Sequence, residues 1–193
     1  MGVVCTIQMA YNLANPMIPR YLIGLGTRET MLLEFSSTMV ALILAGKVGS
    51  NIASELGTMK VTEQVDALEM MGVNSANYLI LPKITGAMFF IPILTIISMF
   101  TGLIGGYLAS FVTNGINPHE YIVGITSYFQ PFYVTYSIIK SVIFAFIIAS
   151  TSSYHGYYTN GGALDVGKSS TQAVVYSSIV ILLANTILTK LML

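Results

Sequence analysis

Long apolar stretches, separated by short polar segments, are the feature that most constrains how this chain can fold. Only 8% of its 193 residues are charged, eight of them basic and eight acidic, against about 25% in an ordinary globular domain. So few charges cannot cover the surface of a soluble domain of this length. The sequence therefore excludes a soluble protein and predicts an integral membrane protein.

The apolar stretches mark the candidate helices. Residues 1–15 are short for a span at about 1.5 Å per residue, so we interpret them as the latter part of a helix that ends at Asn15 and Pro16. Four further stretches suit a hydrocarbon core of about 30 Å and cover residues 30–57, 84–112, 134–150 and 173–193. Alternation typical of β-barrel strands is absent. The predicted fold class is an all-α integral membrane protein with about five transmembrane helices, formed by one domain over residues 1–193.

Small residues recur every fourth position in the stretch 30–57, at Ala41, Ala45, Gly49 and Ala53. This spacing lets membrane helices approach closely. It indicates either helix packing within one subunit or a contact with a second subunit or a substrate. Both readings stay open from the sequence.

Two ionisable residues, Glu34 and Lys47, lie about 20 Å apart along the same predicted helix. They either sit near its two ends, with side chains that reach the headgroups, or face an internal cavity, where charges in a membrane are usually functional. We therefore keep Glu34, Lys47 and the four small residues as candidates for a lipid cavity or for helix packing.

Residues 54–73 interrupt the apolar pattern, because they hold half of the chain's eight acidic residues. Within them, residues 61–73 have the pattern of a short helix: Thr62 can cap its start, Glu63 favours the positive end of the helix dipole, and Gly72 can end it. Two stripes then lie side by side on this helix. The apolar one contains Val61, Val65 and Leu68, and the acidic one contains Glu63, Asp66 and Glu69.

The acidic stripe argues against lipid as the surface that this helix touches. A helix that lies on a cytoplasmic leaflet normally presents Lys and Arg, because that leaflet is anionic. Carboxylates would be repelled, so docking onto another protein explains the stripe better, with a solvated loop helix as the alternative. The distribution of Lys60, Lys83 and Lys168 favours the cytoplasm for residues 58–83.

Residues 162–169 match the phosphate-binding pattern G-x-x-x-x-G-K-[ST]. That pattern works only between a buried strand and a helix of an α/β domain, and here a polar loop precedes it. We interpret it as a Gly-rich turn before the last helix, with Ser169, Ser170 or Thr171 as the cap.

Other chemical constellations are absent from the sequence. His119 and His155 are isolated in the sequence, and we interpret them as polar loop residues. The single cysteine, Cys5, excludes a disulfide framework within the chain. We find no catalytic motif and no metal-ligand spacing, so the sequence predicts a protein that is not an enzyme and holds no cofactor.

Three segments carry a resemblance to a known family. These are "AGKVGSNIASELGTMKVTEQVDALEMMGV" followed by "YLILPK", the later "IKSVIFAFIIASTSSYHGYYTNGGALDVGKSS", and the early "GVVCTIQMAYNL". Together they resemble the MlaE-type permease family, the membrane subunits of lipid-transporting ABC systems that work with MCE-domain proteins. The resemblance covers nearly the whole chain.

The resemblance implies a permease subunit of the bacterial inner membrane that moves phospholipid or a similar lipid. It implies a homodimer, an ABC ATP-binding subunit that binds ATP and Mg, a periplasmic MCE-domain partner and, as a further partner, a small STAS-domain protein. The acidic segment corresponds to the family's coupling helix. The candidate residues for contact with the ATP-binding subunit are Glu55, Thr62, Glu63, Asp66, Glu69 and Met70.

The chain departs from the family pattern at three places. Ser36 and Ser37 stand where Gly-Pro is common, and Asn185 stands where Asp is frequent. The family's N-terminal interfacial helix is missing from this sequence, from which we expect a truncated start. Two other functions compete with an ABC permease. A stand-alone secondary transporter or channel would need broken helices in two repeats, and a structural membrane anchor would need no lipid site.

Overall fold

The computed structural model describes residues 1–13, 19–112 and 117–192, and these ranges contain helices and turns but no β-strand. The all-α prediction is confirmed. Four helical stretches are long and apolar enough to cross a membrane by length and composition: Tyr21–Val61, Ser75–Val112, Pro131–Tyr157 and Ala163–Met192. The helix α1 (Gly2–Asn12) is shorter, and its predicted end at Asn15 and Pro16 lies outside the described residues.

All four stretches extend beyond the apolar runs that predict them. The first begins at Tyr21 rather than near residue 30, and α6 (Ser75–Val112) begins nine residues before the predicted 84. The polar connection predicted over residues 58–83 is therefore longer than the one in the structure. Hydropathy marks the part of a helix that suits lipid, whereas the backbone hydrogen bonds continue into the polar layer beyond it. Pro82 and Pro92 also lie inside α6, as membrane helices tolerate.

The chain forms two compact units. Unit 1 contains residues 1–39 and 94–139, and unit 2 contains residues 40–93 and 140–193. The long helices α6 and α8 (Pro131–Tyr157) contribute residues to both.

In unit 1, α2 (Tyr21–Thr30) packs against α7 (Pro118–Thr126). The two backbones meet at Gly24 and Gly124: a Cβ on Gly24 would collide with the carbonyl of Tyr121, and one on Gly124 with the carbonyl of Tyr21. Tyr121 and Ile23 form the centre of a small apolar core around this contact. Glycine at both positions is therefore what allows the close approach.

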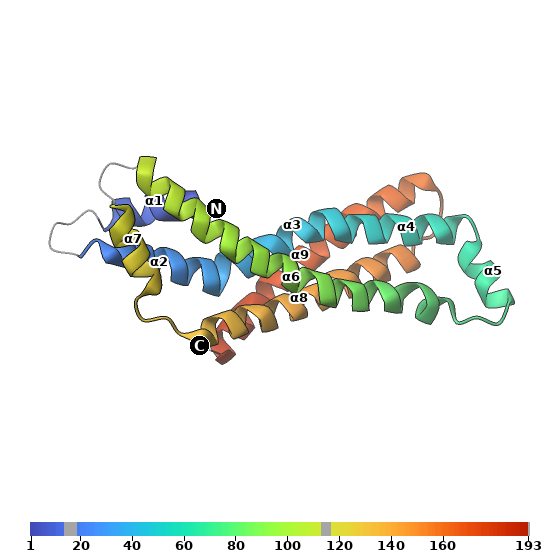
Figure 1. The fold of residues 1–193 in the computed structure, drawn as a ribbon. Coiled ribbons are helices and arrows are strands. Elements are labelled where there is room, and N and C mark those ends of the chain that lie inside the picture. Colours follow the sequence, from blue (N-terminus) through green and yellow to red (C-terminus); the bar gives the residue numbers. More distant parts are fainter. Residues whose placement is uncertain (14–18, 113–116, 193) are drawn as a thin grey trace. The chain divides into compact units, whose positions relative to one another are not determined.

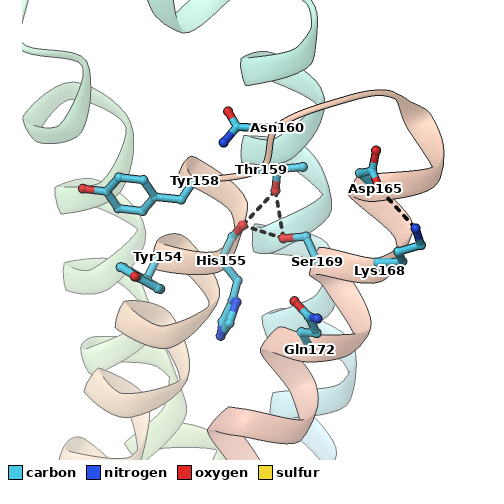
Figure 2. A pocket seen from close by; sticks show the side chains of 9 residues that line it. All are labelled: Tyr154, His155, Tyr158, Thr159, Asn160, Asp165, Lys168, Ser169 and Gln172. Carbon is cyan, nitrogen blue, oxygen red and sulfur yellow. Dashed lines mark hydrogen bonds and ion pairs between the residues drawn. The ribbon is translucent and has the colours of Figure 1, made fainter.

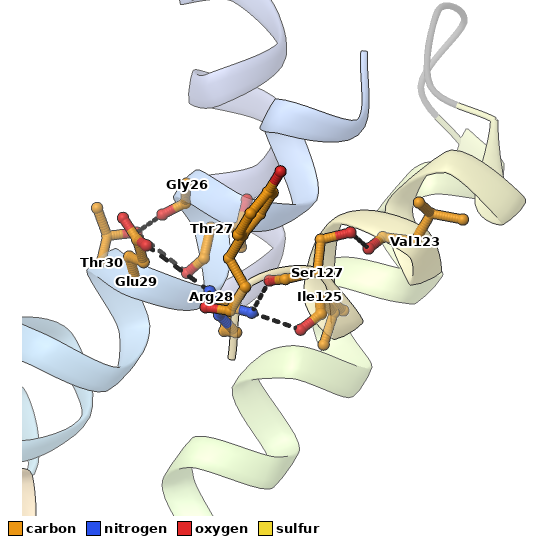
Figure 3. A network of polar contacts seen from close by, with 9 residues as sticks. Gly26, Thr27, Arg28, Glu29, Thr30, Val123, Ile125 and Ser127 are labelled. Carbon is orange, nitrogen blue, oxygen red and sulfur yellow. Dashed lines mark hydrogen bonds and ion pairs between the residues drawn. The ribbon is translucent and has the colours of Figure 1, made fainter. Parts of the chain in front are cut away.

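A buried arginine holds the end of α7 onto α2 (Figure 3). Arg28, only 1% exposed, donates from Nη1 to the carbonyls of Ile125 at 2.7 Å and Ser127 at 2.6 Å, and from Nη2 to that of Tyr128 at 3.2 Å. Carbonyls at a helix C-terminus have no partner within the helix. The guanidinium supplies partners and a positive charge at the negative end of the helix dipole.

Unit 2 is built on small residues. Here α3 (Val40–Leu44), the π-helical turn η2 (Ala45–Gly49) and α4 (Ser50–Val61) continue one another. Ala41 and Ala45 lie in a core with Phe144 and Ile148 of α8 and with Ile181 of α9 (Ala163–Met192). In addition, α4 and α9 run side by side (Figure 1), and Ser170 Oγ donates to the carbonyl of Ser50 at 3.1 Å.

A substitution tests the contact between α2 and α7. Gly124→Ala places a Cβ against the carbonyl of Tyr21, so we expect a destabilisation of about 1–3 kcal/mol. The control Gly86→Ala in α6 meets no atom within 4 Å and should stabilise the helix slightly. Thermal unfolding of the two detergent-solubilised variants measures the difference. Equal melting temperatures would contradict the close contact.

Candidate functional site

A short helix, α5 (Gln64–Met70), follows α4 after a two-residue turn and lies outside all four candidate spans. It ends as predicted at Gly72, which has a φ of 78°. The N–H of Gly72 donates to the carbonyl of Glu69, and that of Val73 to the carbonyl of Leu68. This paired pattern after a helix is the Schellman motif, in which the left-handed residue is usually glycine.

The start of α5 differs from the prediction. Thr62 does not cap it, because α4 continues to Val61 and makes Thr62 the C-terminal cap of α4. The Thr62 hydroxyl donates backwards to the carbonyl of Thr58 at 2.8 Å. Glu63 is the N-cap instead, in the left-handed region at a φ of 61°, and its side chain makes no capping hydrogen bond.

The side chains of α5 divide into two faces. Val65 is fully buried and Leu68 is half-buried, whereas Glu63, Asp66 and Glu69 are exposed. Val61 belongs to α4, so the apolar stripe spans the turn between the two helices. The short helix therefore packs by its apolar side and leaves its acidic side outward.

Two of the three carboxylates have partners within the chain. Asp66 forms an ion pair of 2.6 Å with Lys60 of α4. Glu69 Oε1 accepts hydrogen bonds from the Ser75 hydroxyl at 2.7 Å and from the Tyr157 hydroxyl at 3.0 Å. These contacts attach α5 to α4, to the start of α6 and to the end of α8.

The hydrogen bonds from Ser75 and Tyr157 hold the pKa of Glu69 below its ordinary value, since both favour the ionised form. The contact is therefore complete above the ordinary carboxyl range and is lost as the pH falls through the lowered pKa. Sequence reasoning missed both partners, because a hydroxyl 88 residues away gives no local signal.

The remaining predicted contact residues differ in their surroundings. Glu55 of α4 forms an ion pair of 2.6 Å with Lys83 of α6, so it also joins two helices. The Glu63 side chain has no hydrogen bond or ion pair within the described ranges. Met70 is 89% exposed and its neighbour Met71 is 70% exposed. Among the exposed side chains of this segment, Glu63 is therefore an unpaired carboxylate, and Met70 and Met71 are the large apolar groups.

The second group of candidates lies along the first span. Ala41, Ala45, Gly49 and Ala53 are all buried in unit 2, where Gly49 lies against Ser152 and Ala53 against Gly156 of α8. These contacts are helix packing. That the same residues also line a lipid cavity remains a prediction.

Both ionisable candidates occur in π-helical turns, which are frequent at functional sites. Glu34 lies in η1 (Met31–Met39), which also contains Ser36 and Ser37 and continues through both without a break. Its carboxylate accepts a hydrogen bond of 3.4 Å from the Thr38 hydroxyl. Lys47 lies in η2 and is exposed.

A polar pocket of about 260 Å³ lies where α8 ends and α9 begins (Figure 2). The sequence predicts only a Gly-rich turn here, with a cap at Ser169, Ser170 or Thr171. That cap assignment is wrong, because α9 already begins at Ala163 and Asp165 Oδ2 accepts the N–H of Gly162 at 3.3 Å. Residues 163–171 therefore form helix rather than loop.

Both histidines lie in helices, so their predicted position in loops is wrong. His119 is in the first turn of α7 and His155 is in the last turn of α8. The His155 ring stacks on Tyr176 at a centroid distance of 5.0 Å. Across the described residues, no group of three His, Cys, Asp or Glu side chains could hold a metal ion.

Comparison with known proteins gives consistent matches. The family model described as Permease MlaE matches residues 1–191. A probable ABC transporter permease protein of Rickettsia bellii is 41% identical over 158 residues, which is 82% of this chain and 61% of that protein. The corresponding Synechocystis protein slr1045 is 39% identical over 159 residues, 82% of this chain and 60% of its own.

A plant protein is also similar. Protein TRIGALACTOSYLDIACYLGLYCEROL 1 of Arabidopsis thaliana, a chloroplast protein, is 35% identical over 157 residues, covering 81% of this chain and 45% of its own. The chain spans about three-fifths of the length of the bacterial relatives that it matches.

The Tyr157→Phe variant tests how α5 is attached. Loss of the hydroxyl removes one donor to Glu69, so the Glu69 pKa should rise toward its ordinary value of about 4.3. The matched control is Tyr158→Phe, the next residue, which does not bond to Glu69. A carbon-13 NMR titration of the Glu69 carboxyl measures its pKa in the variant and in the control. An unchanged pKa in Tyr157→Phe would refute the contact.

Proposed function

Because this chain belongs to the MlaE permease family, we propose that it is the membrane subunit of an ATP-driven ABC transporter. Its cargo is phospholipid or a similar lipid, exchanged between the bacterial inner membrane and a periplasmic MCE-domain partner. The name of the Arabidopsis relative contains that of a diacylglycerol lipid, which supports a lipid cargo. The permease acts as a homodimer, and ATP with its Mg²⁺ belongs to a separate ATP-binding subunit.

The attachment of α5 is the observation that carries this proposal. A helix of seven residues is too short to be stable alone in water, yet this one has fixed contacts to three longer helices. The ion pair Lys60–Asp66 joins it to α4, and Glu69 joins it to Ser75 of α6 and Tyr157 of α8. A force applied to α5 would therefore reach three candidate membrane helices at once.

The outward groups of α5 suit a protein partner. Met70 and Met71 are large, flexible apolar side chains that are mostly exposed, and methionine is common at adaptable binding surfaces. Glu63 adds an unpaired, exposed carboxylate at the opposite end of the same short helix. We assign the contact with the ATP-binding subunit to these three residues, and we assign Asp66 and Glu69 to the transmission of movement.

The mechanism follows from this division of roles. Closure of two ATP-binding subunits around ATP would displace α5, and its three attachments would shift α4, α6 and α8. The small residues Ala41, Ala45 and Gly49 allow close helix contacts, so a modest shift changes the packing along α3 and α4. Lipid would then be admitted to or expelled from a cavity in the dimer.

The double variant Glu63→Lys/Met70→Asp tests the proposed contact. It reverses one charge and removes one apolar anchor, so it should weaken binding of the ATP-binding subunit at least tenfold. The expected results are loss of co-purification and loss of lipid-stimulated ATP turnover. Lys190→Glu, an exposed charge reversal at the far end of α9, is the matched control.

Undiminished co-purification and ATP turnover in the double variant would refute the role of α5. Lipid transport by the chain alone in vesicles without ATP would instead favour a secondary transporter. Both measurements use the full chain, co-expressed with its ATP-binding subunit for the first.

A further inference from the structure

The last turn of α8 contacts both α5 and α9. Its Tyr157 hydroxyl donates to Glu69 of α5, whereas His155, two residues earlier, contacts α9. Within the described ranges, α5 itself makes no hydrogen bond or ion pair with α9. The end of α8 therefore offers a route by which movement of α5 reaches a fourth candidate membrane helix.

The backbone carbonyl of His155 makes the first contact with α9 (Figure 2). The N–H of Thr159, which a continued α-helix would direct to this carbonyl, donates to the carbonyl of Gly156 instead. The His155 carbonyl accepts the hydroxyls of Thr159 and of Ser169 in α9. The two hydroxyl oxygens lie 2.8 Å apart, and both side chains are buried. A carbonyl left over at the end of α8 is thus satisfied from α9.

The ring of His155 makes the second contact with α9. It stacks on Tyr176, with the ring centroids 5.0 Å apart and the ring planes at 20°. Tyr176 follows Ser169 by seven residues, so the two contacts lie about two turns and about 10 Å apart along α9. Two points of contact along one axis oppose tilting of α9, whereas a single point would permit it.

The connection from α8 to α9 does not fix α9 by itself. It contains Gly161, at a φ of 119°, and Gly162, and glycine has more conformational freedom than any other residue. Within one chain, α9 is also the least covered of the four candidate spans, with 11% of its most apolar part buried against at least 33% in the others. The contacts of His155 therefore bridge a glycine-containing turn and hold a helix that is mostly uncovered.

The start of α9 also packs against α4. A Cβ on Gly57 of α4 would lie 3.3 Å from both Thr159 Oγ1 and Val166 Cγ1 of α9. A Cβ on Gly156 of α8 would collide with the carbonyl of Ala53 in α4. The glycines let the three helices approach closely, so the start of α9 lies against two of the helices to which α5 is attached.

We propose that His155 is a positioning residue that makes α9 move together with α8 when α5 is displaced. It lies on the helical turn that receives the movement through Tyr157, and it passes the movement to α9 through Ser169 and Tyr176. This inference deepens the proposed function and rests on it, because it adds α9 to the three helices that α5 moves.

Lipid transport per ATP hydrolysed tests this role. The full chain, its ATP-binding subunit and the MCE-domain partner are reconstituted in vesicles that contain fluorescent phosphatidylethanolamine. Ser169→Ala removes the hydroxyl from α9, and we expect transport per ATP to fall about threefold while co-purification and ATP turnover are retained. A contact that serves folding alone would lower both rates together with the amount of complex, so their ratio separates the two roles.

Two variants of His155 test its ring. His155→Ala keeps the carbonyl but removes the stacking on Tyr176, so transport per ATP should fall, whereas His155→Phe keeps an aromatic ring and should restore it. The matched control is Thr171→Val, because the Thr171 hydroxyl is exposed and bonds only to carbonyls of its own helix. Thermal unfolding checks that each variant folds. An unchanged ratio in both Ser169→Ala and His155→Ala would overturn the proposal, and equal losses in the two His155 variants would overturn the ring contact.

A double variant tests the order of the contacts. In Tyr157→Phe, α8 no longer receives the movement of α5 through this hydroxyl, so its contact with α9 has little left to transmit. Tyr157→Phe/Ser169→Ala should therefore lose about as much transport per ATP as Tyr157→Phe alone. Losses that multiply would indicate two independent effects and would overturn the proposed sequence.

Failure of this inference differs from failure of the proposed function. A wild-type complex that moves no phosphatidylethanolamine when ATP is added would overturn both. A wild-type complex that transports the lipid, with the same transport per ATP in the variants, would overturn the role of His155 alone and leave the coupling through α5 intact.

Discussion

Every backbone polar group in the hydrocarbon layer must find a partner within the protein, because lipid offers none. The described ranges meet this requirement with helices, and some hydroxyl side chains bond to the helix that carries them, as Thr27 does with the carbonyl of Ile23 and Thr151 with that of Ile147. Where α7 ends, no helix remains to satisfy its last carbonyls, and Arg28 supplies the donors. A buried cation is costly by itself, and here that cost is offset by three hydrogen bonds and by the Phe129 ring at 5.8 Å.

The same requirement explains how much could be predicted from sequence. Helices followed from the membrane class together with the lack of strand alternation, and the end of α5 at Gly72 follows from the residue type alone. The ends of the long helices could not be predicted, because the first turns of α6 and α9 mix polar and apolar residues and give no continuous apolar run. Thr62 was misassigned for a related reason: a Thr that can cap one helix can also end the previous one.

The candidate site shows a different limit. The acidic stripe of α5 could be read from a spacing of three residues, but the partners of Asp66 and Glu69 depend on tertiary contacts. Lys60 lies only six residues from Asp66, so local charge pairing could have indicated it. Tyr157 is brought to Glu69 only when the end of α8 packs beside α5. The polar pocket likewise exists only because the end of α8 lies beside the start of α9.

The π-helical turn η2 affects which side of the helix the small residues along α3, η2 and α4 occupy. Ala41, Ala45, Gly49 and Ala53 recur every four residues, but an α-helix turns once per 3.6 residues, so each step rotates the stripe by about 40°. Over three steps, an unbroken α-helix would carry Ala53 to a different side from Ala41. The wider π turn between Ala45 and Gly49 acts as an added residue that rotates the helix back, and all four positions are buried. The less regular hydrogen bonding of this π turn thereby keeps the four small residues in one straight row against the neighbouring helices. Removal of one residue from the turn would rotate α4 out of alignment with α8 and α9.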